Sequence, residues 1–460
     1  MTILDAARSY IEATLPSTTS EMISRTDTDA HVVIRGDCAA SAIIDDNDAV
    51  IRILNSIRCR YIFRGTIDGN DQAQIGIMLS GCSNVHVSNF AVHDCVVDSA
   101  DLTAIGVATF GGDSIELSGF AISGIRGLET NDRCSRGVQI GQATGPTIGS
   151  HVHDFSTDDI DGDAVAVNAG SENAQCLIER AAIGSYQWRA LKVFSPGVVF
   201  RDFEIDATND ADGREVFGIF AGDVTISNGT VTASRHLNGF AIQPDVVANG
   251  IVLDNIQMTL TGDCTLEIAT LQYGMRVASN TSGNGRPAVS ALSVIVTTDE
   301  NYLRPLQVAS TCTAFSADGL EMVASGAGEY SIAATDASVR NSSFTNGGPM
   351  KLLSAGGSID DSTFDAVPLW LQADDCRITD SVFDGAEAAN HLIDIQSSNN
   401  MLIGNALIDI GNVTTAPVIA LIIRAGANDN ALVNNDIEPL TYDGTRATGI
   451  SDLGSGNSIT

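Results

Sequence analysis

One phrase decides the fold: IGIMLSGCSNVHVSNFAV at residues 75–92, which returns as IGVATFGGDSIELSGFAI at residues 105–122. Each copy holds an alternating apolar strand, a turn of Gly, Asn or Asp, a second alternating strand, and a short bend into a third. Alternation with a period of two indicates β-strands. The phrase continues through residues 137–152, 190–205 and 216–231, and more tightly in RNSSF, DDSTF and TDSVF, which end at Phe344, Phe364 and Phe383.

The copies recur about every 19 to 37 residues, which is too short for a domain and suits one turn of a solenoid. A strand set of that size cannot bury its apolar face alone, whereas stacked turns bury one continuous core. We therefore predict an all-β fold, a single-domain, right-handed parallel β-helix of about 14–15 coils over residues 48–460. The variable loop lengths favour the right-handed form. An ordinary β-sandwich is the structural alternative.

Residues 1–47 precede the first clear copy and are predicted to form an N-terminal cap or attachment segment. Within them, residues 3–15 have the spacing of a short amphipathic helix, with one apolar side formed by Ile3, Ala7, Tyr10, Ile11 and Leu15. Such a helix would cover the open end of the solenoid, where a sheet edge would otherwise be exposed. A helix for attachment or assembly is the alternative.

The chain has 460 residues with 57 acidic and 24 basic side chains, a formal net charge of −33. A surface this negative repels phosphate backbones and anionic lipid, so we expect no nucleic-acid partner and no membrane role. No stretch approaches the roughly 18 apolar residues that a membrane span needs. The N-terminal residues lack the features of a secretory signal, so an extracellular or virion-surface location would be reached without a cleavable signal peptide.

Long loops precede the first strand of each coil only between residues 123 and 238. Long loops on a rigid scaffold often carry function, and simple drift of exposed loops is the alternative. The residues directly before these strands are Arg136, Asp163, Arg189, Glu215 and Asn238. Because stacked strands lie about 4.8 Å apart, these residues are predicted to form one file along the edge of a groove. A ladder of surface salt bridges is the alternative.

The outward positions of the same strands are small residues around one cation, Lys192. Trp188 lies in the loop beside it, where its indole can serve either as a platform for a sugar ring or as a packing residue. The predicted substrate-binding set consists of Arg136, Asp158, Asp159, Trp188, Arg214 and His236.

Carboxylates are concentrated in TDDIDGD, residues 157–163. Hydrolysis of a glycosidic bond needs two carboxyl groups, an acid and a base or nucleophile. Asp163 and Glu215, two coils apart, would be separated by about 9–10 Å along the stack, near the inverting separation. Asp161 or Asp159 together with Asp163 could give either spacing, and a lyase would instead use cations. The predicted catalytic set is therefore Asp161, Asp163, Glu215, Arg189 and Lys192.

Metal sites are not predicted. The nine scattered cysteines contain no CxxC pair, so we expect buried thiols. Among the histidines, His151 and His153 are two residues apart and should share an outward strand face with no special role, a metal site being the alternative. No cofactor is expected, and the aspartate-rich turn could be a solvated turn or hold calcium incidentally.

The repeat phrase resembles the right-handed parallel β-helix proteins that act on carbohydrates, namely the pectate-lyase and polygalacturonase-like superfamily and the tailspike depolymerases of bacteriophages. GTIDGN at residues 65–70 is similar to an early coil of such proteins. DIDGDAVAV at residues 159–167 looks like the aspartate coil of polygalacturonases, and RALK at residues 189–192 like a loosened Arg/Lys coil. No His-Gly lies between them.

This resemblance implies a polysaccharide-degrading protein, either a glycoside hydrolase or a lyase, that acts on capsular polysaccharide or exopolysaccharide as a virion tailspike. It also implies a homotrimer. A non-catalytic glycan-binding or structural spike or adhesin with the same fold is the alternative.

Overall fold

The structure is a computed structural model. It describes residues 9–97, 102–127, 135–170, 172–208, 213–243, 250–262, 272–277, 287–297, 303–312, 314–325, 328–385, 391–408, 420–437, 441–442, 445–446 and 449–460. Every regular element within these ranges is a β-strand. None of the described residues forms a helix with the length and apolar character of a membrane span. Contacts divide the chain into two compact units, Met1–Ser234 and Arg235–Thr460.

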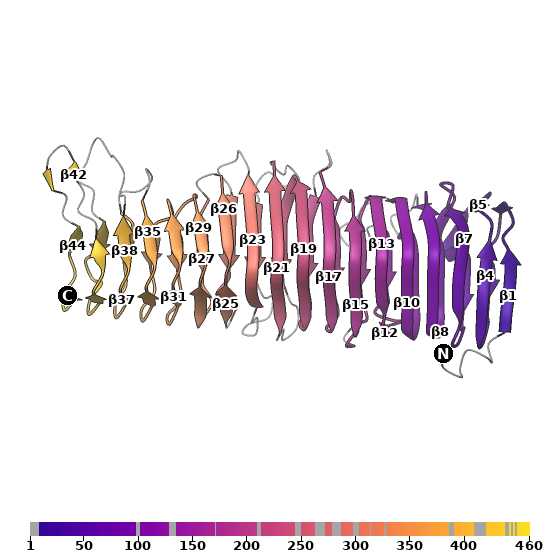
Figure 1. The fold of residues 1–460 in the computed structure, drawn as a ribbon, viewed down its shortest axis with the longest axis horizontal. Coiled ribbons are helices and arrows are strands. Elements are labelled where there is room, and N and C mark those ends of the chain that lie inside the picture. The colour runs from indigo at the N-terminus through magenta and orange to yellow at the C-terminus, as the bar shows by residue number, and fades with distance from the viewer. Residues whose placement is uncertain are drawn as a thin grey trace. The chain divides into compact units, whose positions relative to one another are not determined.

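The strands of the first unit form two parallel ladders, and Figure 1 shows the first of them facing the viewer. In the first ladder each strand pairs with the next in the order β1 (Ser9–Thr14), β4 (Ala30–Arg35), β7 (Arg60–Asp68), β8 (Ala73–His93), β10 (Ile105–Gly127), β13 (His151–Ile160), β15 (Cys176–Ile183), β17 (Val198–Ala207) and β19 (Val224–Ser234). This parallel pairing confirms the predicted solenoid.

The second ladder runs in the order β3 (Ile23–Arg25), β6 (Ile44–Leu54), β8, β10, β11 (Arg136–Ile140), β14 (Asp163–Val167), β16 (Arg189–Val193) and β18 (Gly213–Ile219). The long strands β8 and β10 belong to both ladders because each bends partway. Four short strands complete the unit: β2 (Thr18–Thr19), β5 (Cys38–Ala40), β9 (Val96–Val97) and β12 (Thr147–Ile148).

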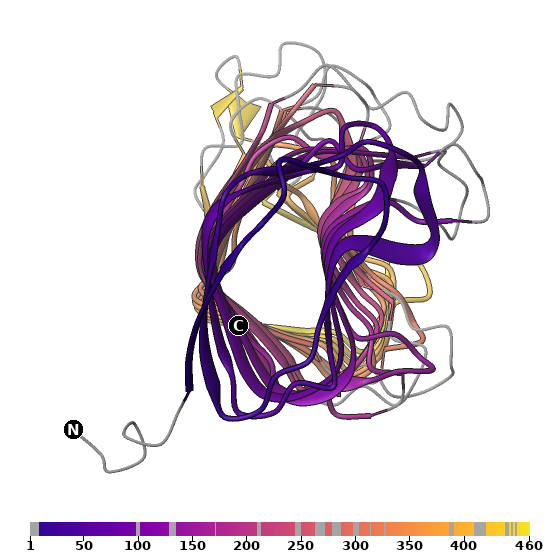
Figure 2. The ribbon, with the colours of Figure 1, turned by 90° about the vertical axis from the view of Figure 1, so that its right-hand side faces the viewer.

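Equivalent positions of successive coils lie directly above one another, as the superposed strands of the first unit show (Figure 2). One interior column of the first ladder is fully buried and consists of Val87, Leu117, Val152, Ile178 and Phe200. Each such side chain contributes about 1.5–3 kcal/mol of hydrophobic stabilisation. The alternating apolar pattern of the sequence is therefore the pattern of this core.

The bend inside each repeat is a single residue with left-handed φ. It is Asn89 (59°), Gly119 (62°), Asp154 (55°), Arg180 (52°) or Asp202 (56°) in five successive coils. Glycine adopts this conformation freely, and Asn and Asp tolerate it better than other residues. These residues form the short bend of the repeat phrase, between its second and third strand segments.

The predicted N-terminal capping helix is not present in the described residues. Residues 9–14 form strand β1, which pairs in parallel with β4, and β4 pairs with β7. Ile3 and Ala7 lie outside the described residues. The sequence SYIEAT alternates more and less exposed positions, and in so short an apolar run the helical and strand periods cannot be told apart.

The second unit begins with longer strands: β20 (His236–Ile242), β21 (Ile251–Thr261), β22 (Gln272–Val277), β23 (Pro287–Thr297), β24 (Leu303–Val308), β25 (Phe315–Asp318) and β26 (Glu321–Ala324). Three ladders of mostly three-residue strands follow: β27 (Tyr330–Ile332), β28 (Ala337–Arg340), β29 (Ser343–Thr345), β30 (Met350–Leu352), β31 (Ser358–Asp360), β32 (Thr363–Asp365), β33 (Leu369–Leu371), β34 (Arg377–Thr379), β35 (Val382–Asp384), β36 (Ile393–Ile395), β37 (Met401–Ile403), β38 (Ala406–Ile408), β39 (Leu421–Ile423), β40 (Ala431–Val433), β41 (Asp436–Ile437), β44 (Ile450–Asp452) and β45 (Ser458–Ile459). A separate antiparallel pair consists of β42 (Thr441–Tyr442) and β43 (Thr445–Arg446).

Short repeats in the second unit are held by stacked side chains. Phe344, Phe364 and Phe383 are buried and stack with ring centroids 5.1 and 4.8 Å apart. Beside them, the backbone N–H of Ser342 donates to Ser362 Oγ, and that of Ser362 donates to Ser381 Oγ, each at 3.2 Å. The cysteines of the described residues are all buried free thiols, as predicted, whereas Cys134 and Cys264 lie outside them.

Candidate functional site

Four residues of the predicted file share one register in the first unit. Arg136 pairs with Asp163, and Asp163 pairs with Arg189, on successive strands β11, β14 and β16. Glu215 follows in β18, where it contacts Arg189. We call Arg136, Asp163, Arg189 and Glu215 the charge file. Asn238 lies in β20 of the second unit, so its position relative to the file is not described.

Ion pairs join three members of the charge file, Asp163, Arg189 and Glu215, from coil to coil. Arg189 Nη1 lies 3.3 Å from Asp163 Oδ1, and Arg189 Nε lies 2.6 Å from Glu215 Oε2. Lys192 Nζ lies 3.6 Å from Asp163 Oδ2. The side chains of Asp163, Arg189, Lys192 and Glu215 are only 0%, 5%, 6% and 12% exposed. The sequence-predicted groups are thus brought together, but in a buried network in which Glu215 is the most exposed member.

A second outward column runs beside the charge file. Gln139, Ala166, Lys192 and Gly218 occupy equivalent positions on successive strands. Arg136 Nη1 donates to Gln139 Oε1 at 2.8 Å, which shows that the two columns face the same side. A Cβ added at Gly218 would lie 2.8 Å from Arg189 Cδ and Nε, so the glycine leaves the space that the guanidinium fills.

Two phenylalanines form a third column that the sequence analysis missed. Phe194 and Phe220 stack with centroids 5.1 Å apart and rings tilted by 23°, and both are partly exposed. Lys192 Nζ lies 4.7 Å from the Phe194 centroid, and Arg189 Cζ lies 5.6 Å from that of Phe220. Each phenylalanine follows an outward strand position by two residues, and this spacing could have revealed the Phe pair.

Trp188 is placed inside this cluster rather than on its surface. It is 7% exposed, and its ring is faced by Arg214 Cζ at 4.5 Å and by Arg189 Cζ at 5.5 Å. Cations over an indole face are attracted by its electron density. In this structure Trp188 therefore supports two arginines and does not offer an open face to a sugar ring.

The aspartates of residues 157–163 have different surroundings. Asp158 accepts hydrogen bonds from Ser185 Oγ and N at 2.7 and 2.9 Å, and these lower its pKa. Asp159 is exposed and pairs with Arg126 Nη2 at 2.8 Å. Asp161 accepts from Gln187 Nε2 at 3.3 Å, and burial raises its pKa above that of an ordinary aspartate. The aspartates of this segment therefore differ in their surroundings, and Asp161, with its raised pKa, is the one suited to keep a proton.

The Asp163–Glu215 pair does not have the arrangement expected for an inverting hydrolase. Both carboxylates contact the same planar guanidinium of Arg189, so the contacting oxygens are at most about 8 Å apart. The inverting arrangement needs about 6.5–9.5 Å between the two groups in order to hold a water between them. Here Arg189 occupies the intervening space. These two residues act as partners of the arginine in this structure.

His236 begins β20 in the second unit and is 3% exposed. Its backbone oxygen accepts a hydrogen bond from Gln272 Nε2 at 3.1 Å. A buried side chain gives no support to the predicted contact with substrate. Residues 128–134 and 209–212, which belong to the predicted long loops, lie outside the described residues.

A second polar cluster covers the outer face of the first ladder, and we call it the histidine face. His86, Glu116 and His151 occupy equivalent positions on β8, β10 and β13. The rings of His151 and His153 are 4.2 Å apart, so the predicted shared face is confirmed. Glu116 Oε1 lies 3.1 Å from His153 Nε2 and 3.6 Å from His86 Nε2. Burial lowers the pKa of His86.

Neighbouring arginine and histidine side chains favour the ionised form of two carboxylates at the histidine face, Glu179 and Asp154. His151 Nε2 lies 3.1 Å from Glu179 Oε1, and Arg201 Nη2 lies 2.6 Å from Glu179 Oε2. Burial would raise the pKa of Glu179, but hydrogen bonds from Arg201, Arg180 and His151 lower it to about 2. Hydrogen bonds from Arg180 and His153 also hold the pKa of Asp154 well below its usual range.

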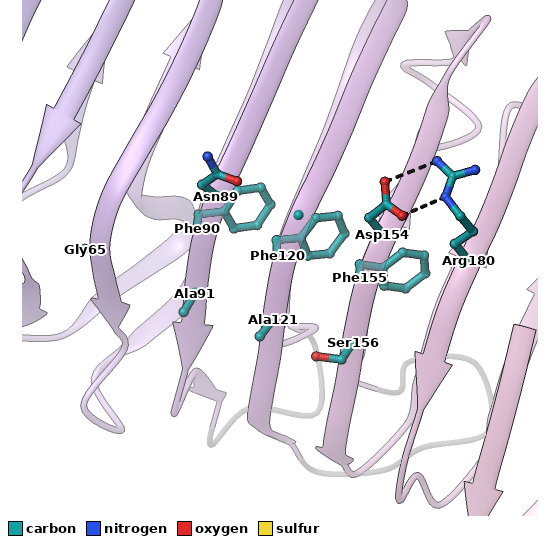
Figure 3. Close-up of a pocket in the computed structure, with 11 residues that line it drawn as sticks. Gly65, Asn89, Phe90, Ala91, Phe120, Ala121, Asp154, Phe155, Ser156 and Arg180 are labelled. Carbon is teal, nitrogen blue, oxygen red and sulfur yellow. Dashed lines mark hydrogen bonds and ion pairs between the residues drawn. The ribbon is translucent and has the colours of Figure 1, made fainter.

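A shallow groove of about 550 Å³ lies next to the histidine face (Figure 3). Phe90, Phe120 and Phe155 stack along it with centroids 4.6 and 5.0 Å apart, and the small side chains of Ala91, Ala121 and Ser156 line it beside them. Asp154 and Arg180 close one end, with Arg180 Nε donating to Asp154 Oδ1 at 2.6 Å (Figure 3).

No protein-family model and no curated protein sequence matches the chain. Solved structures with a similar course of the chain include a tailspike protein of the E. coli bacteriophage HK620 in complex with a pentasaccharide, with 11% identity over 92% of this chain and 72% of that chain, TM-score 0.44. PfbA, a surface adhesin of Streptococcus pneumoniae, matches with 10% identity over 97% and 91%, TM-score 0.33. Endo-xylogalacturonan hydrolase from Aspergillus tubingensis matches with 10% identity over 97% and 92%, TM-score 0.28.

Proposed function

We propose that this protein binds a polysaccharide across the outer face of β11, β14, β16 and β18. One arrangement supports the proposal. The charge file, the column of Gln139, Ala166, Lys192 and Gly218, and the Phe pair lie side by side and repeat at the strand spacing of about 4.8 Å. A glycan is also a repeating chain, with polar groups along its edges and apolar C–H faces on its rings.

The accessible members of this face have the chemistry to contact sugar. The partly exposed Phe pair offers apolar ring faces. Half-buried Arg136 and the 12% exposed side chain of Glu215 offer charge-assisted hydrogen bonds to hydroxyl or carboxylate groups. The more deeply buried Arg189 contacts Glu215 and holds it in position, and Gln139 accepts a hydrogen bond from Arg136.

Hydrolysis of the bound glycan is the second candidate function, and the raised pKa of Asp161 favours it. A general acid must keep its proton near the working pH, which burial of Asp161 promotes. Glu215, the most exposed carboxylate of the charge file, is the candidate for the accompanying base. A lyase reaction is less well supported, because Lys192 and Arg189 are both paired with Asp163.

The binding proposal is tested by affinity electrophoresis of the protein through gels that contain single capsular polysaccharides or exopolysaccharides. At least one glycan should retard the wild type, and F194A/F220A should weaken that retardation tenfold or more. The matched control is Trp370→Ala in the second unit, where Lys351 Nζ lies 5.0 Å from the Trp370 ring, as Lys192 lies over Phe194. Equal retardation of wild type and F194A/F220A would contradict the proposal.

Hydrolysis is tested on the retained glycan by the release of new reducing ends. Asp161→Asn should abolish release and keep binding, whereas Asp202→Asn, which changes an exposed carboxylate on the first ladder, should keep both. Retention without new reducing ends would assign the protein to the non-catalytic alternative, a glycan-binding spike or adhesin. Absorbance from unsaturated uronates would indicate a lyase.

The resemblance to tailspikes predicts a homotrimer and a location on a virion or another extracellular surface. Sedimentation equilibrium of the full chain tests the first of them, with a mass three times the 47.9 kDa of the chain as the expected result.

A further inference from the structure

A group of three metal-ligand side chains lies at one corner of the first unit, away from the charge file. Asp68 ends β7 and His93 ends β8, and the two residues pair in register. Asp94 follows His93 with a left-handed φ of 55°. In the part of the chain that the structure describes, this is the one group of three or more His, Cys, Asp or Glu side chains whose ligand atoms all lie within 4.8 Å of one another.

The spacing of these atoms matches a tetrahedral metal. His93 Nδ1 lies 3.0 Å from Asp94 Oδ2 and 3.4 Å from Asp68 Oδ1. With metal–ligand bonds of about 2.0–2.2 Å, tetrahedral ligands are separated by about 3.3–3.6 Å. The two nitrogen–oxygen distances are therefore close to those that one ion requires, and the two carboxylate oxygens lie within 4.8 Å of each other.

Hydrogen bonding within the group leaves a role for a cation. The single hydrogen that Nδ1 of His93 can carry faces two carboxylate oxygens, and it can satisfy only one of them well. Asp68 Oδ1 also accepts from the backbone N–H of Asn70 at 2.7 Å, which fixes its orientation. On the next coil, Gly124 has no Cβ, and an added one would lie 2.4 Å from Asp94 Oδ1. The glycine therefore keeps space for this carboxylate.

A second His-Asp pair in the same unit shows what differs. His153 Nδ1 lies 2.7 Å from Asp154 Oδ2, and Asp154 has the same φ of 55° as Asp94. There the third side chain is Arg180, whose Nη2 lies 3.0 Å from His153 Nδ1 and 3.1 Å from Asp154 Oδ2. A cation of the protein completes that pair, whereas a second carboxylate, Asp68, completes the pair at His93.

We propose that Asp68, His93 and Asp94 bind one divalent transition-metal ion of the zinc type, with water as the remaining ligand. An imidazole nitrogen with two carboxylates suits Zn²⁺ or Co²⁺, whereas Ca²⁺ and Mg²⁺ prefer oxygen ligands only. The side chains are 31%, 34% and 46% exposed, so the ion can enter from solvent. It would join the ends of β7 and β8.

The test is isothermal titration of the EDTA-treated full chain with ZnCl₂ in a non-chelating buffer, repeated with CoCl₂ and visible absorption. We expect one tight Zn²⁺ per chain, and His93→Ala and Asp68→Asn should each weaken binding by tenfold or more. Asp68→Asn keeps the shape of the side chain, so thermal unfolding of this variant should match that of the wild type without metal.

The matched control is His153→Ala, which changes the corresponding histidine of the second pair and should leave Zn²⁺ binding unchanged. The proposal is overturned if the wild type binds no Zn²⁺, if His93→Ala binds it as the wild type does, or if His153→Ala removes it. The last result would move the ion to the histidine face.

Discussion

Replacing Arg189 with methionine removes the cation that joins two carboxylates of the charge file. Arg189 contacts Asp163 and Glu215 at 3.3 and 2.6 Å, and the side chains of Arg189 and Asp163 are 5% and 0% exposed. Methionine keeps much of the apolar length of arginine, so the main loss is the charge and its hydrogen bonds. Removing one partner of a buried pair costs about 3–5 kcal/mol, because the remaining charge is left in a poorly solvated site.

The matched control is Arg126→Met in the same unit. Arg126 Nη2 lies 2.8 Å from Asp159 Oδ2, a comparable ion-pair distance, but the two side chains are 49% and 54% exposed. Exposed pairs contribute only about 0.2–1 kcal/mol, since water solvates each charge when its partner is lost. The difference between the two variants therefore isolates the effect of burial.

Urea unfolding followed by tryptophan fluorescence measures this difference. The chain has two tryptophans, and buried Trp188 lies in the first unit beside Arg189, whereas Trp370 lies in the second. In a Trp370→Phe background the signal reports the first unit alone. Arg189→Met should lower the free energy of unfolding by about 3–5 kcal/mol. A loss no larger than that of Arg126→Met would refute the buried network.

Three further predictions concern the same unit. The lowered pKa values of Glu179 and Asp154 mean that both carboxylates stabilise the fold above their unfolded pKa of about 4 and lose this contribution as pH falls toward 2. Thermal melts between pH 6 and 2 should show that loss, and Glu179→Gln should reduce its slope; an unchanged slope would contradict it. Phe120→Ala should lower stability by about 3–5 kcal/mol in urea unfolding, because it opens the stacked row, and a loss below about 1 kcal/mol would be inconsistent with a packed stack. Gly218→Ala should cost about 1–3 kcal/mol, because its Cβ meets Arg189 at 2.8 Å; a neutral effect would show that the guanidinium has room to move.

The ladders and the charge file could be predicted from the sequence because both follow from two fixed spacings. Side chains alternate every two residues along a strand, and strands stack at about 4.8 Å. Once the repeats are aligned, these spacings place Arg136, Asp163 and Arg189 in one column, as the structure shows.

The role of each aligned residue depends on contacts that alignment does not contain. Burial of Trp188 comes from Arg214 and Arg189, which cover its ring. Asp163 is enclosed because Arg189 and Lys192 both turn toward it. The direction in which a side chain points depends on the packing around it, and aligned repeats do not show that packing. A groove of catalytic carboxylates was therefore predicted where the structure has a largely buried network.

The N-terminal segment was misassigned for a different reason. Residues 9–14 contain too few apolar positions to separate a period of 3.6 from a period of 2. Pairing with β4 decides the matter, because a neighbouring strand supplies the hydrogen bonds that a strand needs.

Disulfide trapping tests most directly the claim that side chains from successive coils meet on one flank. Gln139 and Ala166 pair on adjacent strands, and Lys192 lies one strand further. Adjacent strands are about 4.8 Å apart, within the Cα separation of a disulfide, whereas two steps of about 9.6 Å exceed it. After oxidative refolding and peptide mass spectrometry, Gln139→Cys with Ala166→Cys should be cross-linked, and Gln139→Cys with Lys192→Cys should not. The opposite pattern would contradict the register on which the charge file depends.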